Sequence, residues 1–393
     1  MKISSVYVGG WFQRTMLQLS EVYDFLRGTG GVINLNEKKL QEHRDALEIE
    51  ELDYGVSGEE YLEFTSKQGI RVKIFEDGLI TLRNSNVTTD TLSLDIKKVQ
   101  DYYETKLSPA INYLFSLGAP VPKELANIEN VYPYFIVLDK AAKKEMEALL
   151  EQTDKQKYFE FDNDKYDVLR GDKYYFINNK SKKLDEIERY IEEQVFIREF
   201  KGQMHRYLNI HRILWERIDD VKAHKMVKGS EIVKFATKLE AYAKTITLID
   251  GRIKQMSTYL PTREKIAKSD KELAEFLVIS GYRYETLADT LKYVTYLWEM
   301  TKNYVGSAQK QFDELKSDVT SKSVNTLTIV TSMSAGAAIL GLFQQSAPKF
   351  TWFGAVYFFV LALIGWGSNK LLRAISKRQK YDVTDVEYEK NIR

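Results

Sequence analysis

Amide and hydroxyl side chains recur at helical spacing inside an apolar stretch near the C-terminus, Val324–Phe343. One face of a helix over this stretch would carry Asn325, Thr328, Ser332, Ala335, Ile339 and Leu342. Several copies of that face around an axis would form a narrow pore with an amide ring, hydroxyl groups and an apolar constriction. Small residues also pack membrane helices against each other, so packing without conduction is the alternative interpretation.

A second apolar stretch, Trp352–Ser368, follows after the short loop Gln344–Thr351. Neither stretch contains Asp, Glu, Lys or Arg, and both lie within the span of roughly 17–25 residues that crosses a bilayer as a helix. The two stretches therefore predict an antiparallel membrane hairpin, in which the aromatic-rich second stretch faces lipid. Basic residues flank the hairpin, which places both termini in the cytoplasm: Lys302, Lys310, Lys316, Lys322, Lys370, Arg373, Lys377, Arg378 and Lys380.

The composition excludes several kinds of chemistry. A net charge of +1 provides no general attraction for nucleic acid, and the absence of cysteine excludes disulfides, thiolate metal sites and a cysteine nucleophile. The four histidines, His43, His205, His211 and His224, lack metal-ligand spacing. We therefore predict no catalytic residues, no metal site, no direct nucleic-acid binding and no cleaved leader peptide.

Residues 1–180 have the pattern of a mixed α/β domain. A strand, a helix, three strands and a second helix are predicted twice in succession, forming either one mixed sheet or two packed sheets. Tight turns are expected at Lys67-Gln68-Gly69, Glu76-Asp77-Gly78 and Arg170-Gly171-Asp172, and the acidic segment Glu48–Glu60 is expected to be a surface loop. Gly9 and Gly10 would follow the first strand and offer backbone N–H groups to a phosphate, with Arg14 nearby; an ordinary turn is the alternative.

Residues 181–323 are predicted to be almost entirely helical. The charged run Lys182–Glu193 is interpreted as a solvated helix face, and a helix over Ser230–Leu260 is expected to end at Pro261. A single helix is predicted from Tyr284 to Phe343. Its packing seam steps by four and three residues through Leu287, Leu291, Val294, Trp298, Thr301, Val305, Ala308, Phe312, Leu315 and Val319.

This layout resembles the CorA family of divalent-cation transporters and channels. The shared features are a cytoplasmic α/β domain, very long helices, a stalk that continues into the first span, a short outer loop, a second span and a basic tail. The resemblance implies a homopentamer whose first span, TLTIVTSMSAGAAILGLF, lines the pore. The family's Gly-Met-Asn signature is absent, because the corresponding place reads Gly341-Leu342-Phe343 followed by Gln344 and Gln345, whose amide oxygens could face a cation.

The sequence thus predicts an α+β membrane protein with an α/β sensor domain (1–180), a helical stalk (181–323), a two-helix pore domain (324–368) and a basic tail (369–393). The leading hypothesis is an oligomeric CorA-like ion channel or transporter, gated by its cytoplasmic domain, in a bacterial or archaeal plasma membrane. Its ligand would be a divalent cation or a nucleotide-type molecule. The alternatives are a membrane effector of antiviral (CRISPR-type) defence activated by a nucleotide second messenger, and a membrane-anchored binding module that does not conduct.

Overall fold

The computed structural model describes residues 2–12, 18–29, 36–57, 59–85, 87–115, 133–154, 156–180, 184–224, 226–269, 271–342, 352, 356, 359, 360, 363, 366, 367, 370, 374 and 378–383. Within them the chain divides into two compact units. Unit 1 comprises residues 1–208 and 248–296, and unit 2 comprises residues 209–247 and 297–393.

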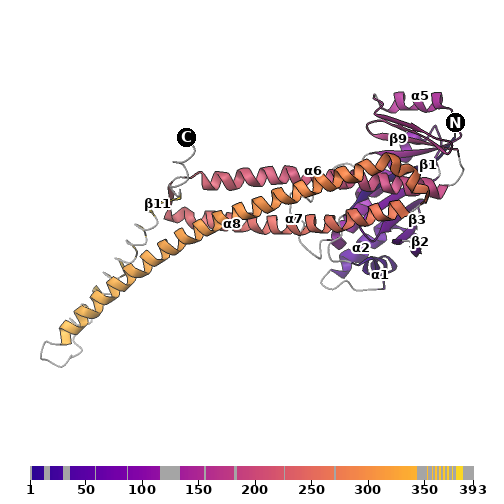
Figure 1. The fold of residues 1–393 in the computed structure, drawn as a ribbon. Helices are drawn as coiled ribbons and strands as arrows, with labels where there is room; N and C mark the ends of the chain where they lie inside the picture. The colour runs from indigo at the N-terminus through magenta and orange to yellow at the C-terminus, as the bar shows by residue number, and fades with distance from the viewer. Residues whose placement is uncertain are drawn as a thin grey trace, which may run out of the picture. The chain divides into compact units, whose positions relative to one another are not determined.

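The protein is an α+β fold with a large mixed sheet and long helices. The strands are β1 (Lys2–Trp11), β2 (Ile49–Ser57), β3 (Glu59–Ser66), β4 (Ile70–Phe75), β5 (Leu79–Asn84), β6 (Tyr134–Asp139), β7 (Phe159–Asp162), β8 (Tyr166–Arg170), β9 (Tyr174–Asn179), β10 (Met226–Lys228) and β11 (Lys380–Asp382). The helices are α1 (Leu19–Arg27), α2 (Glu37–Leu47), α3 (Leu92–Tyr102), the π-helix η1 (Tyr103–Leu107), α4 (Ser108–Phe115), α5 (Lys143–Thr153), α6 (Leu184–Lys222), α7 (Gly229–Ser269) and α8 (Lys271–Leu342). Figure 1 labels most of these elements.

One nine-stranded sheet organises the described part of unit 1, in the order β2-β3-β4-β5-β1-β6-β9-β8-β7. Neighbouring strands are antiparallel except β6 and β9, which are parallel. Of the two predicted arrangements, the structure therefore has the single mixed sheet. The two predicted repeats differ in topology. In the first repeat, β1 runs antiparallel to the last strand, β5, whereas in the second, β6 runs parallel to the last strand, β9.

The three predicted turns are present, but the predicted acidic loop is wrong. Gly69 and Gly78 adopt positive φ angles of 75° and 89° in their turns, a conformation that glycine adopts without steric cost. Residues Ile49–Ser57 form β2, which lies at the edge of the sheet. Charged residues on an edge strand discourage pairing with another chain, so the acidic character marks an exposed edge and not a loop.

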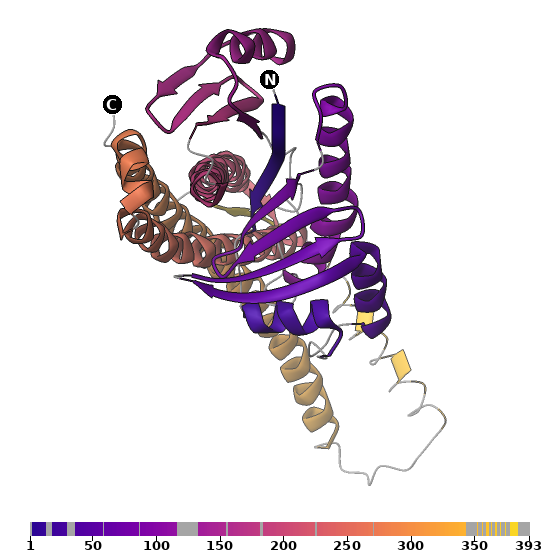
Figure 2. The ribbon, with the colours of Figure 1, turned by 90° about the vertical axis from the view of Figure 1, so that its right-hand side faces the viewer.

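Helices cover both faces of the sheet at β1. A β-carbon added to Gly9 would lie 2.7 Å from a methyl carbon of Val195 on α6, whereas one added to Gly10 would lie 2.5 Å from the Tyr103 hydroxyl on η1. Successive residues of a strand point to opposite faces, so the glycine pair allows close packing on both sides. Figure 2 shows α6 nearly along its axis beside the strands, with α1 and α2 on the other side.

Helix α7 extends beyond its predicted C-terminal end, and helix α8 begins before its predicted start. The prediction that Pro261 ends its helix is wrong, since α7 continues to Ser269. Leu260, Arg263 and Ala267 are buried, and their packing offsets the hydrogen bond that proline cannot make. The predicted seam on α8 is buried from Leu287 through Phe312, and the predicted single helix extends from Lys271 to Leu342.

Unit 2 is held together by aromatic contacts and a small sheet. Trp215 stacks on Tyr304 with ring centroids 4.4 Å apart, and the Tyr304 hydroxyl donates to Asp219 Oδ1 at 2.8 Å. Strand β11, which follows the second apolar stretch in sequence, pairs antiparallel with β10 between α6 and α7. Within the described residues, no helix is both long and apolar enough to cross a membrane.

We expect Gly9→Ala to destabilise the protein by about 1–3 kcal/mol, because the added methyl group overlaps Val195 and the Ile80 carbonyl. Gly202→Ala is the matched control, since its added methyl group meets nothing within 4 Å and removes a helical glycine, a gain of roughly 0.5–1 kcal/mol. Thermal unfolding of the full-length chain measures both. Equal melting temperatures for the two variants would contradict this account of β1.

Candidate functional site

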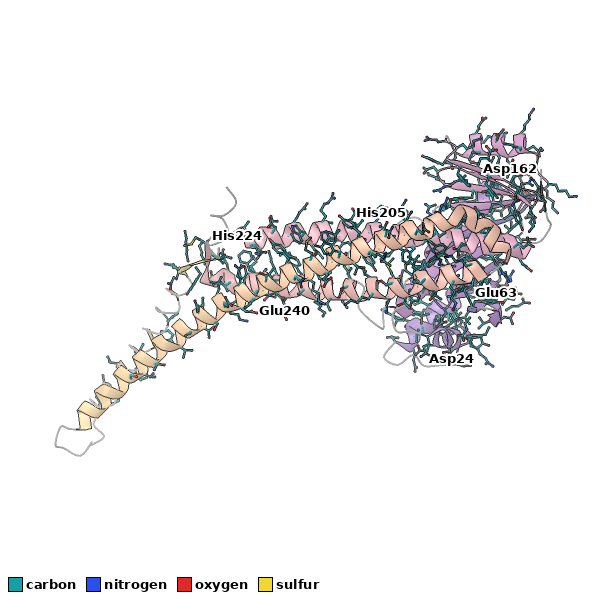
Figure 3. The ribbon with its side chains drawn as sticks, in the orientation of Figure 1. Asp24, Glu63, Asp162, His205, His224 and Glu240 are labelled. Atoms are coloured by element: carbon teal, nitrogen blue, oxygen red, sulfur yellow. The ribbon has the colours of Figure 1, made fainter. Side chains whose placement is uncertain are left out.

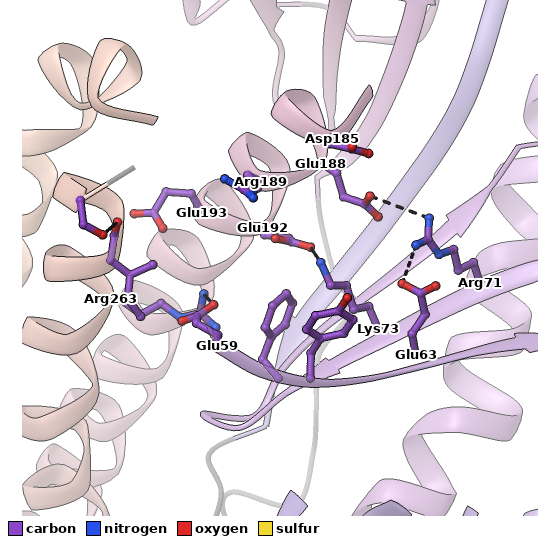
Figure 4. A pocket seen from close by; sticks show the side chains of 14 residues that line it. Glu59, Glu63, Arg71, Lys73, Asp185, Glu188, Arg189, Glu192, Glu193 and Arg263 are labelled. Carbon is purple, nitrogen blue, oxygen red and sulfur yellow. Dashed lines mark hydrogen bonds and ion pairs between the residues drawn. The ribbon is translucent and has the colours of Figure 1, made fainter. Parts of the chain in front are cut away.

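A polar cavity of about 610 Å³ lies in unit 1 between strands β3 and β4 and helices α6 and α7. Figure 4 shows the side chains that line it. They are Glu59, Tyr61, Glu63, Arg71, Lys73, Phe75, Asp185, Glu188, Arg189, Glu192, Glu193, Arg263, Ile266 and Ser269. The strands place alternate side chains on this face, and α6 presents acidic residues to it at spacings of three and four.

Arg263 on α7 is the most constrained cation of the cavity. Its side chain is 6% exposed, and it donates to both carboxylate oxygens of Asp77, at 2.6 and 2.9 Å, and to Glu59 Oε2 at 2.9 Å. Burial opposes the positive charge, but the carboxylates of Asp77 and Glu59 outweigh it and raise the pKa of Arg263. The guanidinium also lies over the rings of Phe75 and Phe196, at 5.0 and 5.5 Å.

Two further cations extend from β4 toward α6. Lys73 Nζ lies 2.7 Å from Glu192 Oε1, and it also sits 4.6 Å from the Tyr61 ring centroid and 4.7 Å from that of Phe75. Arg71 contacts Glu63 Oε2 at 2.5 Å. Lys73 and Glu192 therefore join β4 to α6, and Arg71 Nη1 lies 3.9 Å from Glu188 Oε2 on the same helix.

Glu193 connects the cavity to α8. The Tyr284 hydroxyl of α8 donates to the Glu193 carboxylate, and Arg283 Nη1 donates to Gln194 Oε1 at 2.7 Å. Burial, followed by the nearby Glu193 charge, raises the pKa of Tyr284. Burial also raises the pKa values of Glu192 and Glu193 to about 7, although Lys73 and Tyr284 respectively act in the opposite direction.

The interpretation of Lys182–Glu193 as a solvated face is wrong for most of its described residues, because Glu186, Glu188, Glu192 and Glu193 are buried, whereas Asp185 and Arg189 are exposed. Sequence reasoning missed the cavity for this reason. A signal was present: buried apolar residues in this part of α6 occupy more than one face of the helix. They are Ile187, Tyr190, Ile191, Val195, Phe196, Ile197 and Phe200. A helix that is apolar on several faces is buried, and its carboxylates then need partners.

The structure places two of the three predicted ligand residues, Gly9 and Gly10, within a strand. Gly9 and Gly10 lie inside β1, which continues to Trp11, so their expected position between strand and helix is wrong. Their backbones pair with β5, and Arg14 lies outside the described residues. Phosphate binding by these three residues stays a prediction.

The predicted pore residues Asn325, Thr328, Ser332, Ala335, Ile339 and Leu342 all belong to α8. Thr328 and Ser332 are exposed, and the Thr328 hydroxyl donates to the Val324 carbonyl at 3.0 Å. Gln344 and Gln345 lie outside the described residues. The pore-lining assignment stays a prediction, as do the domain boundaries drawn from the sequence.

Asp24 and Asp162 are carboxylates of unit 1 that do not line the cavity. Figure 3 labels Asp24 on α1 and Asp162 on β7, both away from Glu63 at the cavity. Among the residues that the structure describes, no group of three or more histidine, aspartate or glutamate side chains is arranged to hold a metal ion. No protein-family model and no curated protein matches this chain.

We expect the stability of the protein to fall as the pH rises from about 5 to about 8. The pKa of Glu193 is near 4.5 when exposed and about 7 in the fold, so the folded state binds more protons across this range. The stabilisation is complete below the lower pKa and is lost as the pH rises through the upper one. Glu193→Gln keeps an acceptor for Tyr284 and cannot ionise, so its melting temperature should vary less with pH. Glu240→Gln, an exposed position on α7, should follow the wild type. Identical profiles for wild type and Glu193→Gln would contradict the assignment.

Proposed function

We propose that this chain is an oligomeric membrane ion channel or transporter of CorA type, regulated through the polar cavity of unit 1. The observation that carries the proposal is the continuity of α8. One helix, Lys271–Leu342, bears Tyr284, which is bonded to a wall of the cavity, and also the apolar stretch that begins at Val324. A rearrangement of the cavity would therefore act on the same continuous helix that would enter the proposed pore.

The second apolar stretch supports placement in a bilayer. Its described side chains include Trp352, Phe359 and Trp366, which are 79%, 69% and 63% exposed. Such exposure in water is unfavourable by about 25 cal/mol for each Å² of apolar surface, whereas lipid removes that penalty. Lys370 Nζ lies 4.9 Å from the Trp366 ring centroid, and tryptophan and lysine are typical of the edge of the hydrocarbon layer.

The return of the chain supports a hairpin. Gln311 on α8 donates to the Val383 carbonyl at 3.3 Å. Val383 directly follows β11, which pairs with β10. The chain therefore leaves along α8 and comes back to the same part of unit 2. Between Gln311 and Leu342, α8 rises about 46 Å at about 1.5 Å per residue, more than the roughly 30 Å of a hydrocarbon core. This geometry suits two antiparallel spans whose flanking segments meet on one side.

A pore would need several copies of the chain. The proposed lining of one α8 helix is one face of that helix, on which Thr328 and Ser332 are exposed, and only a ring of such faces encloses a path for ions. We propose a homo-oligomer, with the pentamer of the CorA layout as the reference, and a plasma-membrane location with both termini cytoplasmic.

Ion flux from liposomes containing the purified full-length chain tests this function. The wild type should release a loaded monovalent or divalent cation, and Asn325→Leu or Ser332→Leu should reduce the flux to that of protein-free liposomes by closing the lumen with apolar groups. Thr326→Leu is the matched control, since helical spacing puts it on the opposite face.

Absence of flux for the wild type under every ionic and ligand condition would contradict a channel and leave the non-conducting anchored module. A monomeric particle in mild detergent would likewise contradict the pore.

A further inference from the structure

We propose that the cavity of unit 1 binds a linear organic polycation, of the diamine or polyamine class, through its separated carboxylates. An effect of this binding on ion flux rests on the proposed function, whereas the binding itself depends only on the cavity. The inference differs from both ligand classes predicted from the sequence, a divalent cation and a nucleotide.

The charge balance of the cavity favours a positive ligand. Its described lining holds six carboxylates and four cations. The cations Arg263, Lys73 and Arg71 each already face at least one carboxylate. To bind one of these three cations, a phosphate group would have to displace its carboxylate partner. Displacing a buried partner costs more free energy than displacing one that is exposed to water. An added ammonium group would instead meet surplus negative charge.

Among the described residues of the cavity lining, Glu188 is a buried carboxylate without a close cation. It is 8% exposed and lines the cavity, and its only contact with a cation in the described structure is to Arg71 Nη1 at 3.9 Å. It makes no hydrogen bond with a described residue. A buried carboxylate without hydrogen bonds is costly, so its environment suits a donor from outside the chain. A primary ammonium has three donors, so it could both form an ion pair with Glu188 and donate a hydrogen bond to it.

The aromatic residues indicate that this cavity accommodates an ammonium. The chain's own Lys73 ammonium already sits over the rings of Tyr61 and Phe75 while it contacts Glu192. Aromatic faces attract ammonium groups and do not favour a small, strongly hydrated metal ion. The carboxylates are also spread over β3 and α6 without forming a metal-binding group among the described residues. Separated carboxylates fit a ligand whose positive charges are themselves separated by methylene groups.

Isothermal titration of the detergent-solubilised full-length chain with spermidine at a pH above 7 tests the proposal. The wild type should bind saturably, and Glu188→Gln should weaken binding about tenfold or more, because a charge-assisted hydrogen bond is lost. Glu240→Gln is the matched control at an exposed position of α7 and should bind as the wild type does. Tyr61→Leu, which removes one ring, should also weaken binding and tests the site if Glu188→Gln fails to fold.

Three outcomes would overturn the proposal: no saturable binding by the wild type, equal affinity of Glu188→Gln and wild type, or competition by magnesium chloride or ATP at concentrations that match spermidine. Flux measurements separate the two proposals. Flux without spermidine binding would leave the channel intact and remove this inference, whereas binding to a chain that passes no ions would leave the cavity site and remove the channel.

Discussion

The arrangement of unit 1 depends on the burial of one guanidinium group. Arg263 is nearly excluded from water, and an unpaired buried charge costs several kcal/mol or more. The two carboxylates that pair with it lie at the β4–β5 turn (Asp77) and at the start of β3 (Glu59). Arg263 reaches them because α7 continues past Pro261. These contacts fix the helix against the sheet and leave a polar space between them, which the α6 carboxylates and the β4 cations then line.

The same network reaches α8 through Tyr284. Glu193 belongs to the cavity lining and accepts a hydrogen bond from Tyr284. A ligand can shift a conformational equilibrium only by binding one state better than the other. A positive ligand would hold Glu192 and Glu193 in their ionised forms, whereas an empty cavity near neutral pH leaves both partly protonated, since their pKa values are about 7. This difference provides a physical basis for the proposed regulation through Tyr284.

Local patterns in the sequence predicted much of the fold, whereas pairing between distant segments was out of reach. Gly69 and Gly78 mark their turns through a backbone conformation that glycine favours, and the seam from Leu287 to Phe312 follows helical periodicity. The cavity joins residues up to 204 positions apart in the chain, as Glu59 and Arg263 are, and no local pattern encodes that contact. The acidic residues of β2 and those at the start of α6, Asp185–Glu193, look alike in sequence, yet the former lie on an exposed edge and most of the latter are buried.

The central claim is that the Glu193–Tyr284 hydrogen bond transmits the state of the cavity to the proposed pore. The most direct measurement is the dependence of liposome ion flux on spermidine for Tyr284→Phe beside the wild type, with binding of spermidine measured on the same preparations. The account predicts that Tyr284→Phe binds spermidine and conducts, but that its flux no longer responds to the ligand. A ligand response equal to that of the wild type would contradict the account.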